Sequence, residues 1–303
     1  MSQRQGGDRP FFGIMLMMGF VVFGPFIDIF AKLATETVPV IQIATFRFVV
    51  QGVLLFPVAI LIGCVTWPSR RDMGLYVLRG FLIFMSTATI VGAVKFMPIA
   101  DAIAIVFIEP LILLLLGSVF LGEAVGWRRL VACVVGFVGA ILVIRPSFAA
   151  FGWPAFLPLA TAVFFAIYLI LTRTMSQRLH PLAMQSYTSI GALVVSVPVL
   201  LWFNGSGIAY LDPVMPQGNA VWWIICCGTA AAVSHMFLSY AFRFAPTTLL
   251  GSIHYFEIVT ATIYGYLIFG DLFDGIAAIG VGIIIGSGLY LMYRERQLSR
   301  QAP

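Results

Sequence analysis

Charged residues are scarce in this sequence. Only 10% of its 303 residues are Asp, Glu, Lys or Arg, whereas 61% are hydrophobic. A soluble domain carries about 25% charged residues, because its surface must face water. The mean hydropathy of +1.04 points the same way. We therefore expect most of this chain to lie in a lipid bilayer, with its few charges gathered in short loops.

Catalytic and metal-binding motifs are also absent. The sequence contains no HExxH, no GxSxG and no glycine-rich phosphate loop. Its four cysteines show neither CxxC nor zinc-type spacing, and its basic residues are spread over many short loops. These absences predict a protein that is not an enzyme, that holds no cofactor or metal, and that binds no nucleic acid. A small-molecule transporter and a structural membrane scaffold both remain compatible with them.

Apolar stretches of transmembrane length alternate with polar breaks along the whole chain. A helix needs roughly 20 residues to cross a hydrocarbon core of about 30 Å. Most of the breaks contain Pro, Gly, Asn or Asp, which favour turns. The predicted spans are residues 11–32, 39–62, 72–94, 98–121, 127–145, 153–173, 182–203, 219–243, 246–269 and 274–293. The sequence therefore predicts an all-α membrane protein with ten transmembrane helices.

The basic residues lie mostly on one side of these spans. With the amino terminus in the cytoplasm, the cytoplasmic side holds Arg4, Arg9, Arg70, Arg71, Arg79, Arg128, Arg129, Arg173, Arg178, Arg243, Arg294, Arg296 and Arg300. The opposite side holds only Lys32, Lys95 and Arg145. Such a bias is the positive-inside pattern. It predicts a multi-pass protein of the inner (plasma) membrane with both termini in the cytoplasm.

The second half of the sequence repeats the first at a constant offset. Glu257 follows Glu109 by 148 residues (257 − 109), and Arg243 follows Lys95 by the same 148 (243 − 95). Because each half contains five spans, an odd number, the second half must cross the membrane upside down. Inverted repeats are a recurring design of secondary transporters, with the substrate site near mid-bilayer. Channels also use them, so the repeat favours transport over enzymatic activity more than carrier over channel.

The repeat defines the predicted organisation of the chain. We expect a cytoplasmic tail over residues 1–10, a first five-helix repeat over 11–146, a second, inverted repeat over 147–293, and a cytoplasmic tail over 294–303. The two repeats should enclose a shared polar pocket.

Several short motifs carry a family resemblance. They are Ala44-x-x-Arg47-Phe48, the run Phe96-Met97-Pro98-Ile99-Ala100 followed by Pro110, and Leu121-Gly122-Glu123. Together they resemble the drug/metabolite transporter superfamily, in particular its ten-helix EamA-type branch. Within that branch, the aromatic and Met-rich first, fourth and ninth spans look most like bacterial inner-membrane exporters of aromatic amino acids. The resemblance implies a basket-like bundle around a central cavity.

Two carboxylates are expected near the middle of the membrane. Glu109 and Glu257 each lie 11 residues after a proline that begins a span, or about 16 Å along a helix. A charged group at that depth costs roughly 2.5 to 3.5 kcal/mol on insertion scales. His254 shares a helix face with Glu257, and His235 lies in the preceding span. These side chains are predicted to bind protons or a substrate amino group; hydrogen-bonded packing is the alternative.

Other polar groups and two prolines suggest a gate. Asp28, Arg47 and Asp101 are predicted near the outer ends of the first, second and fourth spans. They form either an outer gate or coupling site, or a set of paired charges that fixes the helices. Pro25 and Pro110 should kink the first and fourth helices, because proline frees a backbone carbonyl. Both kinks suit a pathway or simple packing.

Aromatic side chains complete the predicted cavity. The candidates are Phe23, Phe84, Phe107, Phe164, Tyr168 and Tyr240. Aromatic faces bind apolar groups and also cations. We therefore predict a carrier that exports aromatic or otherwise hydrophobic amino acids by alternating access, either coupled to protons or facilitative. The alternative is an efflux carrier for lipophilic cations or other small amphipathic metabolites.

Overall fold

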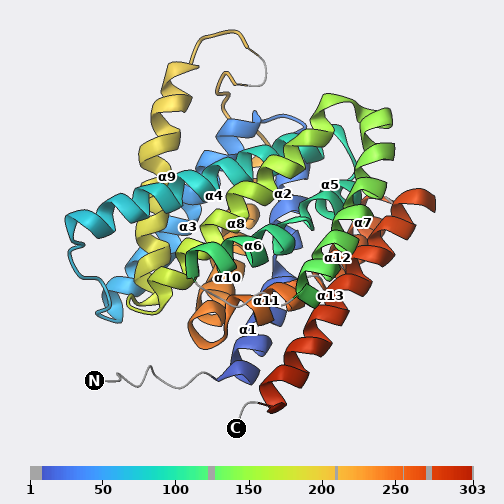
Figure 1. Cartoon of the computed structure of the whole chain (residues 1–303). Helices are drawn as coiled ribbons and strands as arrows, with labels where there is room; N and C mark the ends of the chain where they lie inside the picture. Colours follow the sequence, from blue (N-terminus) through green and yellow to red (C-terminus); the bar gives the residue numbers. More distant parts are fainter. Residues whose placement is uncertain (1–8, 122–126, 209–210, 255, 271–274, 302–303) are drawn as a thin grey trace.

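The computed structural model describes residues 9–121, 127–208, 211–254, 256–270 and 275–301, and helices joined by turns and loops make up this part of the chain (Figure 1). Its α-helices are α1 (Pro10–Phe23), α2 (Pro25–Ala34), α3 (Val40–Leu61), α4 (Arg70–Phe96), α5 (Ile99–Val106), α6 (Glu109–Leu121), α7 (Trp127–Phe151), α8 (Leu157–Ser176), α9 (Pro181–Trp202), α10 (Asn219–Phe244), α11 (Thr247–His254), α12 (Glu257–Phe269) and α13 (Gly275–Gln301). A short 3-10 helix, Trp153–Phe156, precedes α8.

Seven helical stretches among the described residues are long and apolar enough to cross a membrane. They are Phe11–Ala34, Val40–Leu61, Arg70–Phe96, Asp101–Phe120, Trp153–Ser176, Pro181–Trp202 and Asn219–Phe244. Shorter apolar helices occupy Leu130–Gly139, Glu257–Phe269 and Ala278–Ser287. Every predicted span therefore contains helix, and the chain is an all-α membrane protein.

Three of the predicted spans are broken helices. The first is divided between α1 and α2 at Gly24, and the fourth between α5 and α6 at Phe107 and Ile108. The ninth is divided between α11 and α12, although the sequence predicts one continuous helix over 246–269. Proline explains the first two breaks. The ninth span has no proline at its break, so the sequence gives no local signal for it.

The helices pack as a bundle with one peripheral pair. α7 and α13 run side by side along one edge of the molecule, while α4 packs against α8 and α9, and α10 packs against α1, α2 and α3 (Figure 1). The start of α1 and the end of α13 lie at the same end of the bundle. Many large apolar side chains point outward, for example Val53, Leu61 and Val134, as expected where a helix faces lipid.

Glycines allow the closest helix crossings. A Cβ at Gly80 of α4 would collide with the backbone of Gly191 and Ala192 in α9, and one at Gly139 of α7 would lie 2.8 Å from the carbonyl oxygen of Gly280 in α13. Small residues let backbones approach in this way.

Candidate functional site

The centre of the bundle is built on the broken helices. Pro110 has no N–H to donate to the carbonyl of Val106, and its ring crowds the preceding turn, so α5 ends at Val106. The chain turns through Phe107 and Ile108, and α6 starts at Glu109. Glu257 is likewise the first residue of α12. Each break thus places a carboxylate at a helix start inside the bundle, where the helix dipole favours negative charge.

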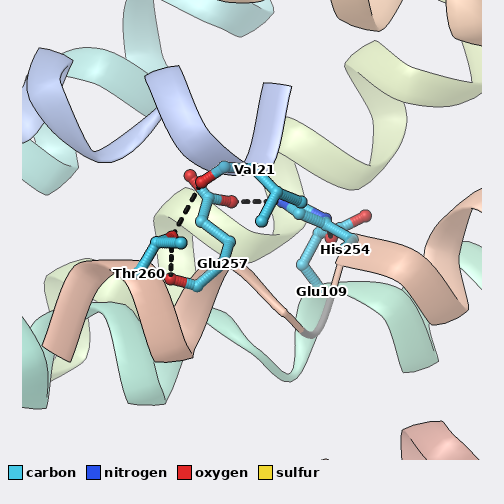
Figure 2. A network of polar contacts seen from close by, with 5 residues as sticks. All are labelled: Val21, Glu109, His254, Glu257 and Thr260. Carbon is cyan, nitrogen blue, oxygen red and sulfur yellow. Dashed lines mark hydrogen bonds and ion pairs between the residues drawn. The ribbon is translucent and has the colours of Figure 1, made fainter. Parts of the chain in front are cut away.

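Figure 2 shows the two carboxylates on either side of one imidazole. His254 Nδ1 lies 2.9 Å from Glu109 Oε2, and His254 Nε2 lies 2.6 Å from Glu257 Oε2. We call Glu109, His254 and Glu257 the His254 cluster. Its two hydrogen bonds need two protons among the three groups, whether the ring is an imidazolium or one carboxyl is protonated. In either arrangement the cluster carries one net negative charge.

The break between α1 and α2 lies against this cluster. A Cβ at Gly24 would stand 2.5 Å from Glu257 Oε1, so only glycine lets the carboxylate come this close. Pro25 cannot donate to the carbonyl of Val21. That freed carbonyl instead accepts a hydrogen bond of 2.7 Å from Thr260 Oγ1 (Figure 2). Such replacement partners are what make a proline in a membrane helix tolerable.

A cavity opens beside the cluster, at the junction of the helices. It is lined by Phe20, Gly24, Ile27, Asp28, Arg47, Ile83, Ser86, Thr87, Ile90, Ile103, Val106, Phe107, Glu109, Thr161, Phe165, His235, His254 and Glu257. Half of these residues are aliphatic, phenylalanine or glycine. The remainder presents carboxylates, hydroxyls, two imidazoles and one guanidinium, which is the composition of a small-molecule site.

Two phenylalanines connect the His254 cluster with the second histidine of the cavity. The Phe20 ring lies 5.4 Å from the His254 ring and 6.0 Å from the His235 ring. The Phe165 ring lies 5.9 Å and 6.3 Å from the same two rings. Phe107 adds a contact of 5.7 Å to His254. Phe20 and Phe165 therefore lie between the polar groups around His254 and those around His235, in contact with both rings.

The second polar end is a buried chain of hydrogen bonds, which we call the Arg47 relay. Arg47 Nη2 lies 2.9 Å from His235 Nε2, His235 Nδ1 lies 3.4 Å from the Tyr168 hydroxyl, and Arg79 Nη2 donates to that hydroxyl at 2.8 Å. Arg47 is 3% exposed and Arg79 is fully buried. No carboxylate hydrogen-bonds to either guanidinium within the described residues.

Several predicted site residues meet in this cavity. Phe107, Glu109, His235, His254 and Glu257 all line it. They come from five different helices or their ends, so only the tertiary fold brings them together.

The predicted gate residues are divided. Asp28 and Arg47 line the same central cavity, and the Asp28 carboxylate is close enough to interact electrostatically with both Arg47 and Glu257. Asp101 lies in the first turn of α5 and does not belong to the lining. Pro25 is the first residue of α2 and Pro110 the second of α6, so each stands at a helix break.

The other predicted aromatic residues lie outside the lining. Phe23 is 41% exposed and stacks on Phe237, Phe84 is buried, and Phe164 contacts Phe81. Tyr168 lies behind the cavity, in the Arg47 relay, and Tyr240 packs edge-on against His180. The five predicted aromatic residues that lie outside the cavity lining are therefore Phe23, Phe84, Phe164, Tyr168 and Tyr240.

Sequence reasoning missed Phe20, Phe165 and Arg79. From the sequence, Arg79 counts only as one of the basic residues of the cytoplasmic side, whereas the structure places it in the buried part of α4, which begins at Arg70. Nine residues of helix advance the chain about 14 Å, which was the available signal. Phe165 stands one position after the predicted Phe164. Adjacent helix residues point about 100° apart, so the choice between them needed the fold.

Among the described residues, no group of three or more His, Cys, Asp or Glu side chains is arranged to hold a metal ion.

The multi-pass helical bundle, with a polar and partly aromatic cavity at its centre, is the architecture of a membrane transporter for small metabolites. The sequence profile of the EamA-like transporter family matches residues 11–145 and again residues 152–294. The chain belongs to this family, and it is a transporter rather than an enzyme.

Characterised relatives carry different cargoes. The chain is 26% identical to the S-adenosylmethionine uptake transporter of Rickettsia felis, over 89% of this chain and 88% of that protein. It is 25% identical to the riboflavin transporter of Brucella anthropi, over 88% and 92% of the two chains. It is 26% identical to the pseudopaline exporter CntI of Pseudomonas aeruginosa, over 84% and 86%.

A solved structure shares the fold. A crystal structure superposes on 94% of this chain and 98% of its own with a TM-score of 0.71, at 17% sequence identity. That similarity extends to the fold alone. The resemblance to the drug/metabolite transporter superfamily is therefore confirmed, while the relatives do not single out aromatic amino-acid exporters.

Proposed function

We propose that this protein carries across the inner membrane a small metabolite in which an α-amino acid group is joined to an aromatic or otherwise apolar body. Aromatic amino acids belong to this class, and so does S-adenosylmethionine. The observation that carries the proposal is the composition of one cavity: carboxylates at Asp28 and Glu257, a guanidinium at Arg47, and the faces of Phe20 and Phe165 beside them. A zwitterion with an apolar body complements all three kinds of group.

Alternating access between two inverted five-helix repeats is the proposed mechanism. The matching of one family profile to each half of the chain supports it. So does the pairing of helices: α4 packs on α8 and α9, and its repeat partner α10 packs on α1, α2 and α3. The equivalent halves can then exchange conformations and open the cavity to either side.

One pair of close contacts supports the repeat in particular. Gly80 meets Gly191 where α4 crosses α9, and Gly228 meets Val50 where α10 crosses α3. The two contacts correspond in the sequence repeat: 228 − 80 is the offset of 148 given above, and 191 − 50 is 141, the offset that also relates Lys32 to Arg173 in the earlier part of each half. A pseudo-twofold axis through the cavity would produce this correspondence.

Counterflow in proteoliposomes tests the proposal. The purified full chain is loaded with unlabelled phenylalanine or S-adenosylmethionine, and entry of the labelled compound is followed, with riboflavin as a comparison cargo. We expect transient accumulation of at least one of the two zwitterions above protein-free liposomes. Absence of accumulation for every zwitterionic cargo tested would reject this substrate class.

Lipophilic cations are the second candidate cargo. Asp28, Glu109 and Glu257 line the same cavity as Phe20, Phe107 and Phe165. Carboxylates beside aromatic faces also suit a cation without a carboxylate. Competition by tetraphenylphosphonium separates the two functions. A cation carrier would be inhibited by it more strongly than by phenylalanine.

We propose export as the direction of transport and the His254 cluster as the place where protons would exchange. The resemblance to exporters supports the direction, and the two protons shared among three groups support the exchange. Flux measured with imposed pH gradients of either sign tests the coupling. Flux that ignores the gradient would establish a facilitative carrier instead.

A further inference from the structure

Arg47 is a buried cation whose hydrogen bonds all go to neutral groups. Its Nη1 donates to Thr87 Oγ1 at 2.6 Å, and its Nη2 contacts His235 Nε2 at 2.9 Å. Its Nε is buried and has no hydrogen-bond partner. The guanidinium lines the cavity and is 3% exposed. Of the five N–H donors of an arginine, two are used here, so three remain for an acceptor in the cavity.

The donor and acceptor roles around Arg47 follow from elimination. A guanidinium can only donate, so His235 Nε2 must accept and His235 must be neutral, with its proton on Nδ1. That N–H donates to the Tyr168 oxygen at 3.4 Å, which also accepts from Arg79 Nη2 at 2.8 Å. The Tyr168 hydroxyl proton then goes to Gln185 Oε1, and Gln185 Nε2 donates to the His235 carbonyl. With the proton of His235 on Nδ1, each of these hydrogen bonds has one donor and one acceptor.

Arg79 anchors the far end of the relay. Its Nε donates to Thr172 Oγ1 at 3.1 Å, and its Nη1 donates to Thr188 Oγ1 and to the carbonyl of Met184. These partners come from α8 and α9, so Arg79 fixes Tyr168 from outside the cavity. The relay therefore ends in one satisfied guanidinium, at Arg79, and one unsatisfied guanidinium, at Arg47.

We propose that Arg47 is the subsite for the carboxylate of the transported metabolite, held in place by the neutral ring of His235. This inference rests on the proposed function. A carboxylate would accept from the unpartnered Nε and from a second N–H of the same planar group. The ammonium group would then face Asp28 and Glu257, which line the same cavity. Arg47 would thus select for cargo that carries an acid group.

Two inhibitors that differ by one group test the subsite. Phenylalanine and phenethylamine share the ring and the ammonium group, but only phenylalanine has a carboxylate. Each competes against uptake of a labelled zwitterion that the wild-type protein carries. We expect phenylalanine to inhibit at a concentration at least about tenfold lower, and Arg47→Gln to bring the two inhibitors to equal potency. Equal potency in the wild-type protein, or an unchanged ratio in Arg47→Gln, would overturn the proposal.

A matched control lies one turn along the same helix. Gln51 is buried in α3 and does not line the cavity. Gln51→Met should keep the wild-type ratio between the two inhibitors. A loss of the ratio in this variant as well would assign the effect to α3 packing and count against the subsite.

Variants of His235 test the positioning of Arg47. His235→Gln offers an oxygen to Arg47 and an N–H to Tyr168, so it should keep the ratio. His235→Phe can do neither, and should weaken inhibition by phenylalanine while leaving phenethylamine unchanged. A packing defect alone would weaken both inhibitors together, which would exclude the positioning role.

Thermal unfolding of the purified protein separates this inference from the proposed function. Stabilisation by phenylacetate that disappears in Arg47→Gln would establish a carboxylate site even if no zwitterion were transported. Transport of zwitterions without any such stabilisation, and without discrimination against phenethylamine, would leave the function standing and remove the subsite.

Discussion

The two histidines of the cavity have the same burial and opposite surroundings. His235 and His254 are each 3% exposed, and both rings contact Phe20 and Phe165. His254 lies between two carboxylates, whereas His235 lies between a guanidinium and a phenol. The His254 ring has an acidic group beside each of its nitrogens, whereas the His235 ring faces a guanidinium that can only donate and must therefore be neutral.

The two polar ends of the cavity therefore differ in the chemistry of their side chains. The His254 cluster, which we propose as the place of proton exchange, holds two carboxylates and an imidazole. The Arg47 relay holds two guanidinium groups, a neutral imidazole and a phenol. Removing each end in turn should therefore have different consequences.

The largest effect is expected from His254→Phe. This change leaves Glu109, which is fully buried, without its only hydrogen-bond partner among the described residues. Breaking a buried ion pair from one side costs about 3 to 5 kcal/mol. We expect a loss of stability of that size, together with loss of transport, measured by unfolding in detergent and by counterflow.

A double variant provides the control for that prediction. Glu109→Gln combined with His254→Phe removes the stranded carboxylate, so it should recover stability relative to His254→Phe alone. Strictly additive losses in the two single variants would show that the carboxylate and the imidazole are not coupled.

Gly24→Ala should have the next largest effect. The added Cβ would force Glu257 Oε1 away from its position 2.5 Å off, and a displacement of about 1 Å in a binding group can cost up to 100-fold in rate. We expect transport to fall at least about tenfold while the protein still inserts and folds. Gly52→Ala is the control, because its Cβ would meet only Ser189 at 3.5 Å; equal losses in both variants would contradict the prediction.

Arg79→Lys should destabilise the Arg47 relay, although it keeps a positive charge at this position. Lysine cannot span Thr172, Thr188 and Tyr168 with one ammonium group. Buried acceptors left without a donor cost about 1 to 3 kcal/mol. We expect a lower unfolding temperature and a weaker preference for phenylalanine over phenethylamine. Wild-type values for both would mean that Arg79 does not hold the relay.

Asp72→Asn marks the lower limit of the series. Asp72 pairs with Arg178 at 2.5 Å, but the Arg178 side chain is 44% exposed. Exposed ion pairs contribute about 0 to 1 kcal/mol. Unfolding and transport should both stay close to wild type. A loss of stability as large as that of Arg79→Lys would contradict the expectation that this exposed ion pair contributes less than the buried hydrogen bonds of Arg79.

Local patterns in the sequence predicted the membrane class, the presence of helix within every predicted span and the two glutamates. These features depend on hydrophobic length and on helix breakers, which act over neighbouring residues. The break before Pro110 belongs to the same kind of information. The break between α11 and α12 does not, because no proline or glycine marks it.

Close packing was harder to predict from the same patterns. The Gly282-x-x-x-Gly286 spacing indicates a helix contact, yet a Cβ at either position would meet nothing within 4 Å in the described structure. The contact between α7 and α13 runs through Gly139 and Gly280 instead. Several glycines at helical spacing offer alternative faces, and the neighbouring helix decides which one is used.

The sequence by itself determined that this chain is a helical membrane protein with acidic groups placed inside its spans. Only the tertiary structure decided what those groups touch. Glu109 and His254 are 145 positions apart, and Arg47 and His235 are 188 apart. Hydrophobicity and helix propensity are local properties, whereas the state of a buried imidazole depends on which distant side chain supplies or accepts its proton.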